Sequence, residues 1–366
     1  MTKVKQKTTK TKSSSTKLNK NSTVKKDSPN KNKTIYKITN WSEYNSALVS
    51  RGSVTIWLSD DILASWGSIE KPPKGSKGGH PKTYSDVAIQ TALTIREVYH
   101  LTYRATEGFV SSLLVMMGAN VKCPDYTTLS YRAETLPVTL SKAAKAALAN
   151  GEALHIAADS TGVKVYGEGE WKVRKHGWSK HRTWRKVHLG VSTSGPSKHL
   201  VATDEMTTNG VGDGDGQLLP KLLNQLTETL PDTPLADLYG DGGYDTKGCY
   251  EAITAKGATS IIPPQKNAKI WQHGNTKAER LPRDQNLRRI RAVGRKTWKQ
   301  ETGYHARSLS ETAMFRFKTL FGHSLSNRQF DTQRTQTKLR IQAMNTMTLL
   351  GMPVSVKVGV ASLPTG

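Results

Sequence analysis

Residues 154–162 read Leu-His-Ile-Ala-Ala-Asp-Ser-Thr-Gly, a short apolar run that passes into an acid and then into small and hydroxylic residues. An apolar run of this length, bounded by turn-forming residues, is typical of a strand buried in a sheet. The charge of Asp159 would then lie at the edge of that sheet. Asp159 is therefore a candidate functional residue, although an aspartate that merely terminates a strand is common.

Short apolar segments and helical patterns alternate around this run. We expect strands at 154–158, 186–193, 198–204, 235–240 and 258–263, and helices at 217–230, 248–256 and 327–350. This order predicts an α/β fold with a mixed sheet over residues 151–355. Apolar positions at helical spacing predict a mostly helical domain over residues 35–150, with helices from Ser85, over 104–117 and over 125–136.

The last two of these helices are joined by residues 118–124, a connection longer than the usual turn of about 3–4 residues. One interpretation is a helix-turn-helix that binds DNA. Its DNA side would carry Thr127, Thr128, Ser130, Tyr131 and Arg132. The other interpretation is a plain helical bundle.

The chain is strongly basic, with a formal net charge of +25 over 366 residues. Such a field attracts polyanions and indicates a nucleic-acid partner. Residues 1–34 hold eleven lysines and one acid, Asp27, so ten of the 25 net charges lie there. Their polar composition cannot form a core, so we expect a disordered tail. It is either a sequence-independent DNA tether or a solvated extension without a specific role.

Cysteine content and hydropathy indicate in which cellular compartment the protein works. Cys123 and Cys249 are the only cysteines, too few for a disulfide framework or a zinc finger, which favours a reducing cytoplasm. No apolar run approaches the roughly 18 residues that span a bilayer. The N-terminus lacks the apolar core of a signal peptide. We therefore expect a cytoplasmic protein without a membrane partner.

A second acid follows another predicted strand. Residues 236–245 read Ala-Asp-Leu-Tyr-Gly-Asp-Gly-Gly-Tyr-Asp, and the glycines beside Asp241 let a backbone or a ligand approach closely. Asp245 is a rival candidate, and an ordinary turn rich in Asp and Gly is the alternative. The nearby Asp213-Gly-Asp215-Gly lacks the later glycine and glutamate of a calcium loop, so it predicts a turn before a helix.

The third acid belongs to a longer pattern. Tyr304, Arg307, Glu311 and Lys318 follow one another at steps of 3, 4 and 7 residues. On one continuous helix they would share an arc of about 60°. That stripe would suit a metal ion on one side and a DNA phosphate on the other. Alternatively, Ser308-x-x-Glu311 is a capping box that leaves Tyr304 and Arg307 outside the helix.

Acids from separate elements matter because phosphodiester chemistry needs charge neutralisation, an activated oxygen and an in-line geometry. Two Mg²⁺ ions about 3.5–4 Å apart supply all three, and Mg²⁺ prefers carboxylate oxygens. Asp159, Asp241 and Glu311 are the carboxylates that such a site would use.

These residues resemble a known family. The Tyr304, Arg307, Glu311 and Lys318 spacing matches the Y-x2-R-x3-E-x6-K signature of bacterial insertion-sequence DDE transposases. Asp159-Ser-Thr and Asp241-Gly-Gly-Tyr resemble the family's two Asp boxes, in the same order. Segments 170–177, 182–190 and 307–322 resemble the IS-five branch of the family, and the likeness covers about residues 36–355.

The resemblance implies an RNase H-like catalytic core in which Asp159, Asp241 and Glu311 hold two Mg²⁺ ions, with Mn²⁺ as a substitute. It implies cleavage at the element ends and transfer of the 3′-OH ends into target DNA, without a covalent protein–DNA intermediate. Tyr304, Arg307 and Lys318 would grip the double-stranded element end. Two ends must be cut together, so a homodimer or a higher oligomer is implied, in the bacterial cytoplasm at the nucleoid.

Two basic stretches provide further candidates for DNA contact. Residues 171–188 interleave basic side chains with tryptophans, which suits phosphate contact and base stacking; an exposed hairpin anchored by its tryptophans is the alternative. Residues 266–299 are rich in arginine and predict a DNA-facing loop. The candidates from the two stretches are Arg174, Lys175, Arg182, Trp184, Arg185 and Arg295.

Overall fold

The computed structural model describes residues 33–67, 83–165, 184–208, 214–272 and 279–361. The described residues fall into two units, 33–39 with 354–361, and those of Asn40–Pro353. In the first, β1 (Lys33–Ile38) pairs antiparallel with β8 (Ser355–Ala361). The expected disordered tail of residues 1–34 is therefore two residues too long, because Lys33 and Thr34 pair with β8. Residues 1–32 lie outside the described residues.

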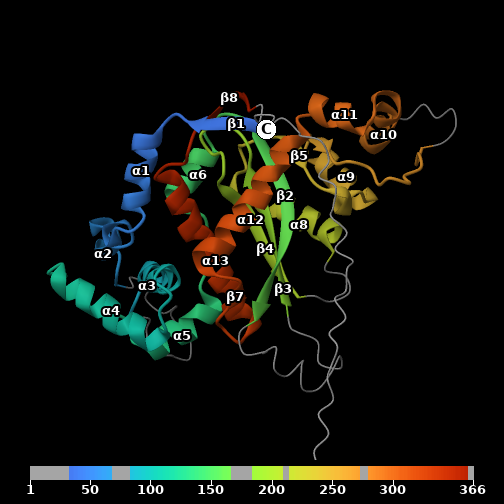
Figure 1. Ribbon diagram of the computed structural model, residues 1–366. Coiled ribbons are helices and arrows are strands. Elements are labelled where there is room, and N and C mark those ends of the chain that lie inside the picture. Colours follow the sequence, from blue (N-terminus) through green and yellow to red (C-terminus); the bar gives the residue numbers. More distant parts are fainter. Residues whose placement is uncertain (1–32, 68–82, 166–183, 209–213, 273–278, 362–366) are drawn as a thin grey trace, which may run out of the picture. The chain divides into compact units, whose positions relative to one another are not determined.

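The second unit is built on a mixed sheet, which confirms the predicted α/β class (Figure 1). Its strands run in the order β4-β3-β2-β5-β6, and β7 pairs with the end of β2. The strands are β2 (Leu154–Val165), β3 (Trp184–Ser192), β4 (Val201–Thr207), β5 (Leu235–Tyr239), β6 (Thr259–Ile261) and β7 (Ser324–Leu325). β3 is antiparallel to β2 and β4, whereas β5 and β6 run parallel to β2.

β2 is longer than its apolar run. The sequence predicted a strand that ends at residue 158, but the backbone stays paired with β3 as far as Lys164 opposite Trp184. Cross-strand hydrogen bonding holds the polar residues 159–162 extended, although their side chains carry no strand pattern. Asp159 therefore lies inside a strand rather than in a turn after it.

The helices begin where side chains can cap them. Ser85, Thr102, Asp125 and Ser141 each accept a backbone N–H of the first turn that follows. The α-helices are α1 (Trp41–Ser50), α2 (Asp60–Ala64), α3 (Asp86–Val98), α4 (Tyr103–Met116), α5 (Tyr126–Thr135), α6 (Lys142–Leu148), α8 (Asp215–Thr229), α9 (Lys247–Ala255), α10 (Pro282–Val293), α11 (Arg295–Glu301), α12 (Ser308–Phe321) and α13 (Phe330–Leu349). Short 3-10 helices are η1 (Val54–Ile56), η3 (Gly242–Tyr244) and η4 (Tyr304–Arg307). No helix among the described residues could span a membrane.

The two faces of the sheet have different cores because side chains alternate along a strand. Ile156 and Ala158 of β2 pack with the leucines of α8 and with α9. Ala157 and Val163 point to the opposite face, which α12 and η4 cover. Figure 1 shows α12 and α13 in front of the sheet.

The N-terminal helices share a core with this second face. Residues of α3, α4 and α5 belong to the same hydrophobic cluster as β3, α12 and α13. α13, near the end of the unit, packs on both α3 and α5. The described residues between 40 and 150 therefore share their core with the sheet and with α12 and α13, and the expected boundary at residue 150 falls inside one compact unit.

The connection between α4 and α5 changes one expectation about DNA contact. Arg132 is buried, where it pairs with Asp86 and donates to the carbonyl of Tyr84 at 3.1 Å. It therefore cannot belong to an exposed DNA-binding side, as the helix-turn-helix interpretation required. Thr127 and Thr128 donate their hydroxyls to Asp125, the cap of α5.

A buried charged network joins α3 to α13. Glu97 is 4% exposed and accepts from Arg340 Nε at 2.7 Å and from Gln336 Nε2 at 2.9 Å. Arg96, the preceding residue, also pairs with it. A carboxylate buried in this way leaves unpaired cations behind when it is removed.

We expect Glu97→Ala to destabilise the protein by about 3–5 kcal/mol, the cost of breaking a buried ion pair from one side. Chemical denaturation measures the change. Glu251→Ala provides the control, because the Lys247–Glu251 pair is exposed and should matter little. Equal stability losses in the two variants would show that the network is not what holds α3 to α13.

Candidate active site

The strand register brings two of the acids together. β2 and β5 are parallel neighbours, with Ala157 opposite Tyr239. Asp159 and Asp241 each follow two residues later, so they occupy equivalent positions just beyond the last paired residues of β2 and β5. Because side chains alternate with a period of two, both lie on the face that α12 and η4 cover. Gly243 N–H donates to Asp241 Oδ1 at 2.8 Å and orients that carboxylate.

The third acid reaches the same place by packing of η4 and α12. η4 packs on β2 and β5, and α12 packs on β2 and β3. Tyr304 anchors this segment: it is 8% exposed, and its ring lies 5.9 Å from that of Trp298. Both rings share a small core with Ala157 and Tyr239, directly beneath the two aspartates.

The start of α12 follows neither of the two expected arrangements. Tyr304 and Arg307 lie in a 3-10 turn that leads into α12, so the four signature residues are not on one continuous α-helix. No capping box forms either, because the hydroxyl of Ser308 donates to the carbonyl of His305 at 2.8 Å. The turn nevertheless places Arg307 beside Glu311.

Arg307 links two of the acids directly. Its Nη1 lies 3.2 Å from Asp159 Oδ2, and its Nη2 pairs with Glu311 Oε1. Ser160 N–H donates to the other oxygen of Asp159 at 2.8 Å, and Ser310 Oγ lies 3.5 Å from Oδ2. One guanidinium therefore bridges carboxylates that come from a strand and a helix.

The electrostatics of Asp159 show that the three acids interact. Burial raises the pKa of Asp159, the N–H of Ser160 and the charge of Arg307 lower it, and the charges of Asp241 and Glu311 raise it again. The outcome is a raised pKa, because the carboxylate is partly buried among like charges.

The donor set fits a divalent cation in chemistry and charge. Three carboxylates against one guanidinium leave two negative charges, and carboxylate oxygens are the ligands that Mg²⁺ prefers. Among the described residues, no three acidic, histidine or cysteine side chains are already arranged around one point as ligands. Arg307 occupies the space between Asp159 and Glu311, so an ion shared by these two acids would have to compete with it.

The rival acid at the second box has a structural role. Asp245 is buried, pairs with Arg283 Nε at 2.7 Å and accepts the N–H of Gln265 at 3.0 Å. Both of its oxygens are thereby used in packing. Asp241, one 3-10 turn earlier, is the acid that the sheet presents.

The other predicted DNA contacts that the structure describes make no hydrogen bond or ion pair with the three acids. Arg185 pairs with Gln333 at 2.7 Å, Arg295 donates to the carbonyl of Pro264 at 2.6 Å, and Lys318 is half-buried on α12. Trp184 packs beside Gly162, near the far end of β2. Arg174, Lys175 and Arg182 lie outside the described residues.

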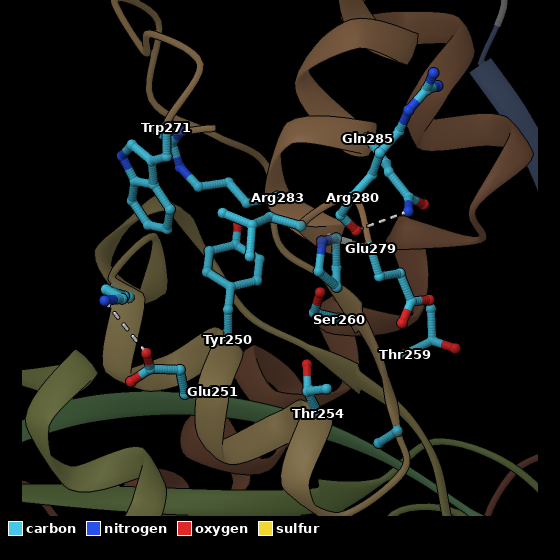
Figure 2. A pocket seen from close by; sticks show the side chains of 14 residues that line it. Tyr250, Glu251, Thr254, Thr259, Ser260, Trp271, Glu279, Arg280, Arg283 and Gln285 are labelled. Atoms are coloured by element: carbon cyan, nitrogen blue, oxygen red, sulfur yellow. Dashed lines mark hydrogen bonds and ion pairs between the residues drawn. The ribbon is translucent and has the colours of Figure 1, made fainter. Parts of the chain in front are cut away.

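A pocket of about 540 Å³ lies between α9, β6 and the start of α10 (Figure 2). The rings of Trp271 and Tyr250 stand edge to face, and the guanidinium of Arg283 lies over the Trp271 ring at 3.8 Å. Arg283 is therefore committed to packing and to Asp245, although the sequence placed it in a DNA-facing stretch. None of the three clustered acids lines this pocket.

Sequence reasoning missed several residues around the acids. Ser310 gave no signal, because a lone serine is common in any fold, and Tyr244 was noted only as part of the second Asp box. Lys186, His188 and Asp215 gave a weak one: Asp215 was recognised only as an acid before a helix. These three residues lie on the opposite face of the sheet.

Carboxylates gathered from two neighbouring strands and a helix form a donor set that could hold divalent ions against a phosphodiester. Two family models, both described as a transposase DDE domain, match residues 49–168 and 150–346. The second match covers more than half of the 366 residues, and the chain belongs to this family of DDE transposases. Membership implies that the protein binds DNA and is an enzyme of the nuclease or transposase type. The family generally uses divalent metal ions.

The raised pKa of Asp159 predicts a pH-dependent stability difference. A carboxyl with a raised folded-state pKa costs stability once it ionises, so this part of the stability is lost as pH rises through that pKa. Asp159→Asn removes the cost. We expect the variant to melt at the same or a higher temperature than the wild type at pH 7, with the difference shrinking toward pH 4. A lower melting temperature for Asp159→Asn at pH 7 would contradict this.

Proposed function

We propose that this transposase cuts DNA at the ends of an insertion sequence of the IS-five type and transfers the freed 3′-OH ends into target DNA. Asp159, Asp241 and Glu311 would hold two divalent ions, Mg²⁺ or Mn²⁺, in an RNase H-like core. The observation that carries the proposal is that Arg307 bridges Asp159 and Glu311, while Asp241 lies near enough to Asp159 for its charge to raise the pKa of that acid.

Bound ions would neutralise phosphate charge and activate the attacking oxygen. The chain's own task is to hold the carboxylates in place. Asp159 is fixed within a paired strand and oriented by the N–H of Ser160, and Asp241 is oriented by the N–H of Gly243. Glu311 is the adjustable member, because its side chain is 56% exposed at the start of α12.

Arg307 has a second task once DNA is present. A guanidinium pairs with phosphate oxygens as readily as with carboxylates. Moving from Asp159 and Glu311 to a phosphate of the element end would leave both acids to the ions. Lys318, two turns further along α12, would contact a phosphate nearby. Tyr304 is mostly buried, so its role would be to anchor η4 rather than to grip DNA.

The wider DNA contacts and the assembly are part of the proposal. Double-stranded element ends and target DNA would meet the helices before residue 150 and the basic stretches, including Trp184, Arg185, Arg295, Arg174, Lys175 and Arg182. A homodimer or a higher oligomer would bring two ends together, in the bacterial cytoplasm at the nucleoid. The Lys-rich N-terminus would add sequence-independent affinity.

We expect Asp159→Asn, Asp241→Asn and Glu311→Gln each to reduce Mg²⁺-dependent cleavage of supercoiled element DNA by more than about 100-fold, the upper range for residues that only support a metal ligand. Binding to the element end, measured by gel shift, should stay near that of the wild type. Asp237→Asn is the control, because Asp237 pairs with His155 at 2.6 Å, nearer the start of the same two strands.

One variant of the three that cuts at the wild-type rate would remove that residue from the site. A protein that binds ends but never cuts would be a catalytically inactive binder. A pre-cut end with a free 3′-OH separates joining from hydrolysis: joined product is expected, and its absence with intact cleavage would leave a nuclease.

We expect Arg307→Gln to tighten Mn²⁺ binding in the absence of DNA by at least about fivefold, because two unit charges 4 Å apart are worth roughly 1 kcal/mol even in water. Electron paramagnetic resonance of free Mn²⁺ measures the affinity. Arg307→Lys keeps the charge and should bind Mn²⁺ nearly as the wild type does. Unchanged or weaker binding by Arg307→Gln would show that Arg307 and the ion do not compete.

A further inference from the structure

A second charged cluster lies directly behind Asp159, on the opposite face of the sheet. Ser160 follows Asp159 in β2, so its side chain points to the α8 face, and His188 of β3 is its cross-strand partner. Asp215, the first residue of α8, contacts two residues of β3 there. Its Oδ1 lies 2.9 Å from Lys186 Nζ and 3.3 Å from His188 Nδ1. The side chain of Ser160 also contributes to lowering the pKa of Asp215.

This cluster is held firmly. His188 is fully buried, and its Nε2 lies 3.1 Å from the hydroxyl of Thr207 on β4. Burial alone would raise the pKa of Asp215, but hydrogen bonds from His188, Ser160 and Lys186 outweigh it and lower the pKa. The carboxylate is therefore charged, at the helix end where a negative charge is favoured.

The same end of α8 also packs on the turn that carries Asp241. The second oxygen of Asp215 lies 3.7 Å from where a Cβ on Gly243 would be, and Gly243 is the residue whose N–H orients Asp241. A Cβ on Gly216 would lie 3.3 Å from the carbonyl of Gly243 and 2.9 Å from Thr246 Cγ2. The contact between helix and turn therefore leaves no room for a methyl group.

Asp215 thus connects three elements: β2 beside Asp159, β3 beside β2, and the turn after Asp241. A buried ion-pair cluster is a weak source of stability, because desolvation offsets much of the attraction. The location of this cluster suggests that it positions metal ligands and does not mainly add stability. Residues that hold metal ligands from behind set the ligand geometry, and their loss typically costs about 10–100-fold in metal affinity.

We propose that Asp215 is a positioning residue that sets the separation of the Asp159 and Asp241 carboxylates from the face of the sheet opposite to them. The inference rests on the proposed function, because it concerns the ions that these two acids would share. Asp215 itself does not touch the reacting atoms.

The first test measures Mn²⁺ affinity of the full chain by electron paramagnetic resonance, without DNA and together with the melting temperature. We expect Asp215→Asn to weaken Mn²⁺ binding by about 10–100-fold. Asp237→Asn is the matched control, since it removes the carboxylate that pairs with His155 of β2 and should leave Mn²⁺ affinity unchanged. Wild-type affinity in Asp215→Asn, or an equal loss in Asp237→Asn, would overturn the proposal.

A second test disturbs the same joint without changing charge. Gly216→Ala would ordinarily favour a helix. Here the added methyl should push the turn away from α8 and weaken Mn²⁺ binding. Thr246→Ser in the same chain removes the obstructing Cγ2 and keeps the hydroxyl that caps α9, so it should restore part of the affinity. Wild-type affinity in Gly216→Ala, or no recovery in the double variant, would count against the proposal.

The Asp159→Asn variant distinguishes a failure of the positioning role from a failure of the proposed function. Loss of Mn²⁺ binding in this variant together with wild-type binding in Asp215→Asn would overturn only the positioning role. Unchanged binding in Asp159→Asn would mean that the acids do not hold the ion, so the proposed function would fail and the positioning role with it.

Discussion

The repulsion among Asp159, Asp241 and Glu311 is the constraint on which the rest of the site depends. Three carboxylates this close together repel one another, and either a proton or a cation must offset the repulsion. Arg307 supplies one charge and bridges two of the acids. It can do so because Tyr304 and Trp298 pack η4 onto β2 and β5. The small apolar core beneath the acids therefore determines where the positive charge is held.

Successive residues of β2 face opposite sides of the sheet and lie near different charged groups. Odd-numbered residues around Asp159 face α12 and the other acids, whereas Ser160 faces α8 and Asp215. The three acids thus lie on one face, and the ion pairs of Asp215 with Lys186 and His188 lie on the other. The face with the three acids carries more negative than positive charge around Arg307, whereas the acid on the opposite face is paired with basic side chains.

Much of this was predictable from local patterns. Apolar runs located the strands, apolar positions at helical spacing located the helices after Ser85, and the resemblance to DDE transposases indicated the three candidate acids. Long-range packing was not predictable: α13 draws α3 and α5 into the core, and Asp86 and Asp245 bury Arg132 and Arg283. The start of α12 was also not predicted. The sequence alone does not determine whether Ser308 caps the helix or, as in the structure, donates its hydroxyl to the carbonyl of His305.

Anomalous diffraction from crystals soaked in Mn²⁺ tests the central claim most directly. We expect a peak at the edge of β2 and β5, with carboxylate oxygens of Asp159 and Asp241 at about 2.0–2.2 Å, close to the distance for Mg²⁺. We also expect the Arg307 guanidinium to have left the gap between Asp159 and Glu311. No peak at saturating Mn²⁺, with Arg307 still bridging the two acids, would contradict a metal site built from these residues.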